Sequence, residues 1–132
     1  MPATVPATAQ TPGCAVSPSP DDETAIAGMI NGARASRALP KVRMHDAIRA
    51  AGRRWSVRMA RTGEFRHTRL EWTRGRPGGE NISVAPTARG SFVAQMNGPP
   101  HRRNLLTRAW RFVGVGAARC DGALFVTVNL MR

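Results

Sequence analysis

The sequence of 132 residues contains little of what several specialised classes of protein are built from. It has no tyrosine and only 5% aromatic residues, so it offers no obvious stacking platform for nucleic-acid bases. It has two cysteines and no CxxC spacing, which excludes a disulfide-rich miniprotein and a zinc knuckle. No apolar run approaches the roughly 18 residues that a membrane span requires. These absences leave a chain of one domain's length that can form its own core.

Acidic residues are scarce as well. Eight acids oppose 20 basic residues, and all of the basic residues except Lys41 are arginine, which gives a net charge of +12. A charge of this size attracts polyanions, such as nucleic acid, acidic lipid or an acidic cell-wall polymer. The charge alone does not choose among these partners.

The N-terminus differs in composition from the rest of the chain. Residues 1–20 contain five prolines among Ala, Thr and Ser, so we predict a disordered arm over 1–20 and a folded domain over 21–132. The Ala7-Thr8-Ala9 segment is similar to the small-residue cleavage site of a secretory signal whose apolar part is missing from this chain. Chance occurrence in an Ala/Thr/Pro-rich tract is the alternative.

Cys14 and Cys120 allow one disulfide. In an oxidising compartment this bridge would join the N-terminal segment to the end of the chain and close a loop of about a hundred residues. The alternative is a pair of unrelated thiols.

Helical patterns occupy the first three quarters of the chain. We predict a helix that begins at Asp21-Asp22, a second that follows Asp46 and stops at Gly63, a third over about 87–97, and a further helical turn over 101–106. One side of the second helix carries a row of arginines, which is either a solvated face or an anion-binding surface. The row consists of Arg49, Arg53, Arg54, Arg58 and Arg61.

The C-terminus predicts a β-hairpin. Two strand-like runs, 110–119 and 123–131, are joined by Asp121-Gly122, which is a strong signal for a two-residue turn. Gly114 and Gly116 fall on one face of the first strand, so we expect another element to pack closely there. Helices followed by a hairpin indicate an α+β domain with helices on an antiparallel sheet.

Three residues are candidates for chemistry: His67, Glu80 and His101. Two imidazoles and a carboxylate suit zinc, with the fourth position left to water. The same residues could act as acid, base and orienting carboxylate. Their spacing matches no local metal motif, so unrelated polar contacts are a third reading.

Several short motifs occur in an order that resembles the bacterial branch of the CAP superfamily. This is the family of cysteine-rich secretory proteins, antigen 5 and pathogenesis-related 1 proteins, also called SCP-like domains. The resemblance covers about residues 24–131. The motifs that carry it are Asn31-Gly32-Ala33-Arg34, Met59-Ala60, His67, Gly79-Glu80-Asn81-Ile82, His101 to Leu106 and Val113-Gly114-Val115-Gly116.

The resemblance implies an α-β-α sandwich with a central antiparallel sheet and a C-terminal β-hairpin, in a secreted or surface-attached protein. It implies a cavity in which His67, Glu80 and His101 meet and hold zinc or another divalent cation, as in several members. It gives Asn104 a structural role. Gln95 stands where bacterial members commonly carry Trp, and no carboxylate lies between Glu80 and Asp121, so we do not expect a cage of four protein ligands.

Two functions follow from these observations. The resemblance favours a non-enzymatic binding module for a lipid, cell-envelope or protein partner, and the charge favours an anionic one. The alternative is a metal-dependent, peptidase-like hydrolase that activates a water at His67, Glu80 and His101. The motifs place no serine or cysteine nucleophile beside a base, which favours the binding module over the enzyme. Nucleic acid is the least supported partner.

Overall fold

The predicted C-terminal hairpin is confirmed, and it lies at the centre of the sheet. The computed structural model describes residues 14–132. β4 (Phe112–Cys120) and β5 (Ala123–Met131) pair antiparallel around Asp121, whose φ of 54° lies in the left-handed region that Asp tolerates. β3 (Gly78–Ala85) pairs antiparallel with the other side of β5 and forms one edge of the sheet.

Two short strands complete the sheet on the other side of β4. β1 (Ser17–Pro18) pairs antiparallel with the end of β4, and β2 (Arg43–Met44) pairs parallel with its beginning. The other strand pairs in the described part of the chain are antiparallel. The predicted antiparallel sheet is therefore confirmed, apart from this short parallel edge.

The structure of β1 differs from the prediction of a disordered arm over residues 1–20. Residues 1–13, which include Ala7-Thr8-Ala9, lie outside the described residues. For residues 17–20 the expected lack of secondary structure is wrong. Ser17–Pro18 pairs with β4, and the backbone N–H of Ser19 donates to the carbonyl of Ala117 at 2.9 Å. The sheet provides hydrogen-bond partners that the local sequence does not reveal.

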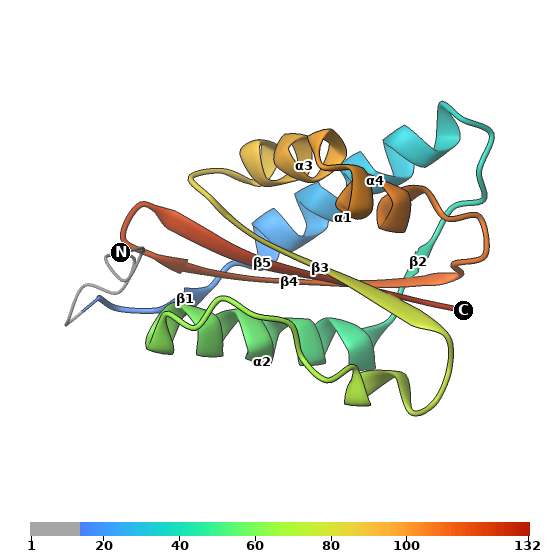
Figure 1. The fold of residues 1–132 in the computed structure, drawn as a ribbon. Coiled ribbons are helices and arrows are strands. Elements are labelled where there is room, and N and C mark those ends of the chain that lie inside the picture. The colour runs from blue at the N-terminus through green and yellow to red at the C-terminus, as the bar shows by residue number, and fades with distance from the viewer. Residues whose placement is uncertain (1–13) are drawn as a thin grey trace.

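Helices cover both faces of the sheet (Figure 1). α2 (Asp46–Thr62) lies on one face, together with the short 3-10 helix η2 (Glu71–Thr73). The other face carries α1 (Pro20–Ala35), α3 (Ala88–Asn97) and α4 (Pro99–Leu106). The predicted α-β-α sandwich is confirmed. No described helix is both long and apolar enough to cross a bilayer.

The helix ends agree with the sequence to within a residue or two. Gly63 ends α2 in the left-handed conformation with a φ of 74°, as predicted. Asp46 is the first residue of α2 and not its cap, which is His45, whose Nδ1 accepts from the N–H of Ile48 at 3.4 Å. α3 ends at Asn97, and Gly98 caps both its end and the start of α4. Pro99 begins α4, because proline suits the first turn of a helix.

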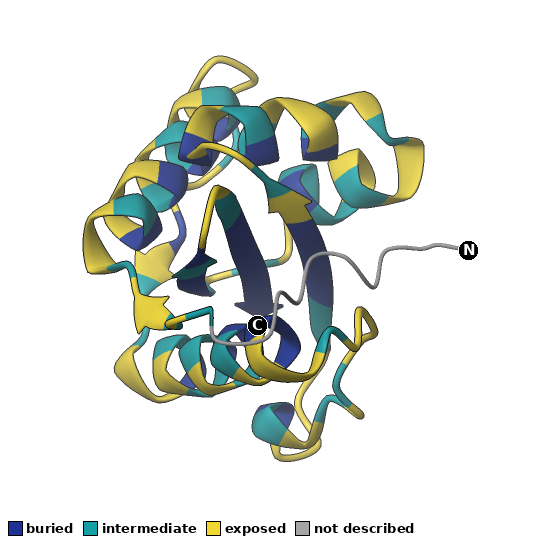
Figure 2. Ribbon diagram, turned by 90° about the vertical axis from the view of Figure 1, so that its left-hand side faces the viewer, coloured by how far each residue is buried: buried dark blue, intermediate teal, exposed yellow. Residues whose placement is uncertain are grey.

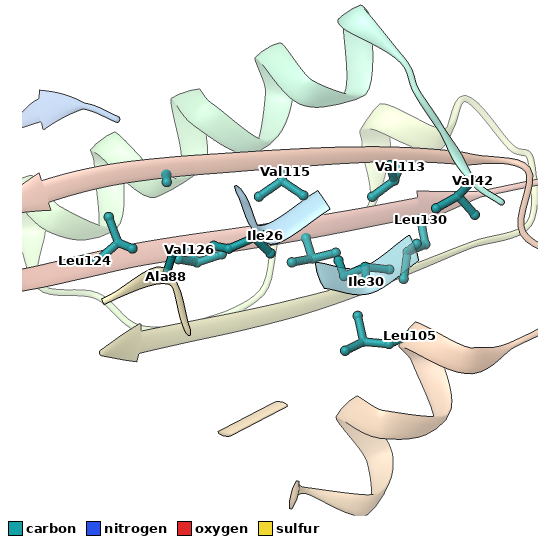
Figure 3. Close-up of a cluster of buried hydrophobic side chains, with 12 residues drawn as sticks. Ile26, Ile30, Val42, Ala88, Leu105, Val113, Val115, Leu124, Val126 and Leu130 are labelled. Atoms are coloured by element: carbon teal, nitrogen blue, oxygen red, sulfur yellow. The ribbon is translucent and has the colours of Figure 1, made fainter. Parts of the chain in front are cut away.

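Alternation along the strands divides the core between the two faces. On the face toward α1, α3 and α4, buried aliphatic side chains from the hairpin meet Ile26, Ile30 and Leu105 (Figure 3). On the face toward α2, Met59 packs against Phe125 in a smaller cluster. Figure 2 shows the central strands as largely buried and the outer faces of the helices as exposed.

The glycines of β4 allow α2 to approach closely, as their spacing predicted. A Cβ at Gly116 would overlap the α2 backbone at Gly52, and a Cβ at Gly114 would overlap it one turn earlier at Ile48. From the helix side, a Cβ at Gly52 would lie 3.2 Å from the backbone nitrogen of Gly116. Helix and strand therefore touch backbone to backbone.

Cys14 and Cys120 are joined by a disulfide, with their Cα atoms 5.8 Å apart. The bridge connects residues 106 positions apart, and Cys14 packs against the core cluster that contains Cys120. It ties the chain just before β1 to the end of β4, the strand with which β1 pairs.

Substitution of Gly116 by alanine tests the close approach of α2. We expect Gly116→Ala to lower the free energy of unfolding by about 1–3 kcal/mol or more, because the backbone cannot move aside as a side chain can. Gly32→Ala is the control: Gly32 is exposed in α1 with nothing within 4 Å of an added Cβ, and should gain about 0.5–1 kcal/mol. Denaturant titration measures both, and equal effects would contradict the packing.

Reduction tests the disulfide. The chain-entropy relation predicts that adding dithiothreitol lowers the free energy of unfolding by up to about 4.7 kcal/mol for a loop near this length. The Cys14→Ser/Cys120→Ser variant should start at the lower stability and ignore the reductant. A wild-type unfolding midpoint that is the same with and without reductant would contradict the bridge.

Candidate functional site

The carboxylate of Glu80 is the centre of a dense hydrogen-bond network. Glu80 lies on β3, and its side chain is only 1% exposed. Oε1 accepts from His67 Nδ1 at 3.0 Å and from the backbone N–H of Thr68 at 2.9 Å. Oε2 accepts from Thr68 Oγ1 at 2.7 Å and from Trp72 Nε1 at 3.0 Å. The structure therefore brings two of the three predicted site residues, His67 and Glu80, together.

The connection between α2 and β3 supplies these donors. The indole N–H of Trp55 on α2 donates to the carbonyl of Arg66 at 2.8 Å and holds the start of the loop. Farther along, Thr68 Oγ1 accepts from the N–H of Leu70 at 3.0 Å, and Leu70 has a φ of 58°. This turn leads into η2, which directs Trp72 toward the carboxylate. The sequence patterns pointed to neither Thr68 nor Trp72.

His101 does not join this network. Among the described residues, the one set of three potential metal ligands within 4.8 Å of one another is Cys14, Cys120 and Asp121, and its two cysteines are bridged. The His101 ring lies against Gly98: its Nδ1 is 3.0 Å from the position of a Cβ there. The three predicted ligand atoms therefore do not converge in this structure.

Strand alternation explains why His101 is separate. Successive residues of a strand face opposite sides of the sheet, so Glu80 and Asn81 point to different layers. Glu80 meets the η2 side, whereas the amide of Asn81 donates to the backbone carbonyl of His101 on α4 at 3.0 Å. His101 approaches β3 from the layer opposite to His67.

The arrangement does not fit a metal site with Glu80 as a ligand. Each carboxylate oxygen already accepts two hydrogen bonds from this chain, so neither is left for a metal. His67 is 54% exposed, and its Nε2 is the ring nitrogen that Glu80 does not hold. A carboxylate that holds one histidine nitrogen is typical of a group that orients the ring.

A second polar network, behind Asn81, is structural. Asn81 is buried and donates to Gln95 Oε1 at 3.0 Å, while its own oxygen accepts from Asn104 Nδ2 at 3.0 Å. It thereby joins β3 to both α3 and α4. The structural role expected for Asn104 is confirmed. Gln95, at the position where bacterial members commonly carry Trp, accepts from Asn81 and donates to Ser91.

The arginines in the row on α2 fall into two groups, because only some of them pair with a buried carboxylate. Arg49 Nε and Arg53 Nη2 lie 3.0 Å and 2.5 Å from Oε1 of Glu23, a fully buried carboxylate of α1. Glu23 also accepts from the backbone N–H of Ala117 at 3.0 Å. The hydrogen bonds that Arg53 donates to Glu23 raise the pKa of Arg53. For these two arginines, the reading as a solvated or anion-binding face is wrong.

The remaining arginines of the row face solvent. Arg54, Arg58 and Arg61 are exposed and line a groove of about 440 Å³ beside Val57. Arg58 lies 3.6 Å from Glu64, but Arg54 and Arg61 form no ion pair with a described residue. We call the surface formed by Arg54, Arg58 and Arg61 the arginine face.

Comparisons with known proteins place these features in a family. No curated protein matches the chain. Among solved structures, an extracellular protein with an SCP domain from Bacillus anthracis is 22% identical, with a TM-score of 0.76; the match covers 86% of this chain and 41% of that one. This chain therefore spans about two fifths of that protein.

Two further structures share the fold. An outer surface protein of Borrelia burgdorferi is 12% identical, with a TM-score of 0.81 over 90% of this chain and 98% of the other. A cysteine-rich secretory protein of Staphylococcus aureus is 16% identical, with a TM-score of 0.68 over 85% and 39%. The model of the cysteine-rich secretory protein family, CAP, matches residues 27–130. The chain belongs to the CAP superfamily, and its described residues have the fold of bacterial SCP domains.

Proposed function

We propose that this domain is a non-enzymatic binding module that works outside the cell and holds an anionic surface of the cell envelope against its arginine face. The observation that carries the proposal is the arginine face itself. Arg54, Arg58 and Arg61 project from one helix, and no acidic side chain lines the groove between them. A net charge of +12 would add long-range attraction to this local contact.

The neighbouring loop extends the positive surface. The guanidinium of Arg58 lies 5.8 Å from the ring centre of Trp55, and that of Arg66 lies 5.0 Å from it. Stacking on the ring restricts both arginines. They share one carboxylate, Glu64, at 3.6 Å from Arg58 and 3.3 Å from Arg66, so the pair keeps a net positive charge. Guanidinium groups also donate in pairs to phosphate and carboxylate oxygens, which suits them to an anionic surface.

The saturated state of Glu80 supports binding over hydrolysis. A general base needs a free lone pair within hydrogen-bond reach of the proton that it removes. Both oxygens of Glu80 are already occupied by donors from His67, Thr68 and Trp72. Nothing in this arrangement favours the hydrolase.

An extracellular location has two supports. The Bacillus anthracis and Borrelia burgdorferi proteins that share the fold are described as extracellular and as an outer surface protein. The disulfide between Cys14 and Cys120 suits an oxidising compartment. Secretion of this chain is part of the proposal.

Sedimentation with lipid vesicles tests the arginine face. We expect the protein to sediment with phosphatidylglycerol vesicles, and to be released as salt rises from about 50 to 500 mM, because counterions screen exposed charges. The Arg54→Gln/Arg58→Gln/Arg61→Gln variant should bind at least about fivefold more weakly.

The control carries the same loss of charge on the opposite layer: Arg89→Gln/Arg102→Gln/Arg103→Gln, all exposed on α3 and α4. Its binding should change by no more than about twofold. Equal loss in both variants, or binding that ignores salt, would contradict the proposed face.

The divalent metal stays a prediction that rests on the family resemblance. Because Glu80 is saturated and His101 lies in the layer opposite to His67, we expect any zinc to bind weakly, with the Nε2 of His67 as its main ligand. Calorimetric titration with zinc should show heat for the wild type and none for His67→Ala/His101→Ala. Equal, negligible heat in both proteins would end the metal hypothesis.

A further inference from the structure

A second positively charged hollow lies away from both Glu80 and the arginine face. Its lining residues belong to the end of the sheet where β2, the beginning of β4 and the end of β5 meet. Figure 1 shows β2 and the C-terminus at this end of the sheet. Its volume is about 530 Å³, within the usual range of small-molecule sites. Five of its lining residues are basic and none is acidic: Lys41, Arg43, Arg108, Arg111 and Arg132. We call it the end cavity.

The positive charges around the end cavity are not neutralised by the protein. None of the five basic side chains forms an ion pair with a described residue. The one hydrogen bond found for them is a long contact of 3.5 Å, from Arg108 Nη2 to the carbonyl of Ala38. Elsewhere in the fold, Arg49 and Arg53 share the buried Glu23. The end cavity is therefore a concentration of free guanidinium donors.

A buried arginine adds charge behind the rim. Arg34 on α1 is fully buried; its Nε donates to the carbonyl of Pro40, a cavity residue, at 2.8 Å. Its Nη1 donates to the carbonyl of Thr107, next to Arg108, at 2.8 Å, while Nη2 has no hydrogen-bond partner in the described residues. Burial and, secondly, the charge of Arg108 lower the pKa of Arg34. The fold thus holds like charges close together, and an anion would relieve their repulsion.

Aromatic side chains form part of the wall. Trp110 and Phe112 both line the cavity, and the indole N–H of Trp110 is already satisfied by the carbonyl of Asn104 at 2.8 Å. The guanidinium groups of Arg43 and Arg76 lie 5.7 and 5.6 Å from the ring centre of Phe112. The ring restricts Arg43, so less side-chain entropy is lost when a ligand binds.

We propose that the end cavity binds a ligand bearing phosphate and at least two negative charges, with its organic part against Trp110 and Phe112. Phosphate fits better than a single carboxylate because it offers more oxygens to several separated guanidinium groups. The volume accommodates a phosphate ester or a diphosphate, and the wall is both cationic and apolar. This site is separate from the arginine face and does not depend on it.

Calorimetric titration with pyrophosphate at about 50 mM salt tests the site. We expect measurable binding to the wild type and at least about tenfold weaker binding to Arg108→Gln/Arg111→Gln, since both side chains are exposed and each would lose a charged hydrogen bond. The control Arg89→Gln/Arg103→Gln removes the same charge from α3 and α4 and should change the affinity by less than about threefold.

Thermal denaturation of all three proteins establishes that they are equally folded. No binding of pyrophosphate to the wild type, or the same loss in the cavity variant and the control, would overturn the proposal. The first result would show that the end cavity does not bind phosphate, and the second that pyrophosphate is attracted only by the total charge of the protein. Neither result bears on the arginine face, whose variant is different.

Vesicles distinguish two sources of the phosphate. If pyrophosphate displaces the protein from vesicles that contain cardiolipin, whose headgroup carries two phosphates, and the cavity variant binds these vesicles weakly, the ligand is a lipid headgroup. If the cavity variant loses pyrophosphate binding but keeps vesicle binding, the ligand is a soluble phosphate. Both results support the end cavity as the phosphate site.

Discussion

The close approach of α2 to β4 is the contact on which the rest of the molecule depends. Gly114 and Gly116 expose strand backbone, and Gly52 exposes helix backbone, so the two elements meet without side chains between them. Side-chain hydrogen bonds then cross the contact: Ser56 Oγ donates to the carbonyl of Gly116 at 3.0 Å, and Asn129 Nδ2 donates to that of Ile48 at 3.2 Å. Buried donors need acceptors, and these two donors find them across the layers.

This contact also determines which charges are structural. It places Arg49 and Arg53 of α2 within reach of Glu23, which comes from α1 on the other face and also accepts a hydrogen bond from β4. With eight acids for 20 basic residues, such pairing neutralises only a minority of the arginines. Several of the unpaired ones lie together at the arginine face and at the end cavity. Part of the charge surplus in the sequence thus forms two separate surfaces.

The Glu80 network follows from the position of β3 at the edge of the sheet. An edge strand can be reached from both layers, and its alternating side chains divide between them. Glu80 is enclosed by the connection that follows α2, while Asn81 binds the layer of α3 and α4. The two halves of one sequence motif therefore serve different layers, and the carboxylate is held as an acceptor within the fold.

Local patterns in the sequence predicted the hairpin, the helix ends to within a residue or two and the close packing at the glycines of β4. They could do so because turns, caps and periodicity act over a few neighbouring residues. The order of the short motifs indicated the family. They also brought His67 and Glu80 to attention. Tertiary structure alone decided that His101 lies apart from them, that Glu23 takes two arginines from the predicted face, and that three distant segments form the end cavity. Each of these depends on which side of the sheet a residue faces and which distant residue lies opposite, and spacing along the chain contains neither.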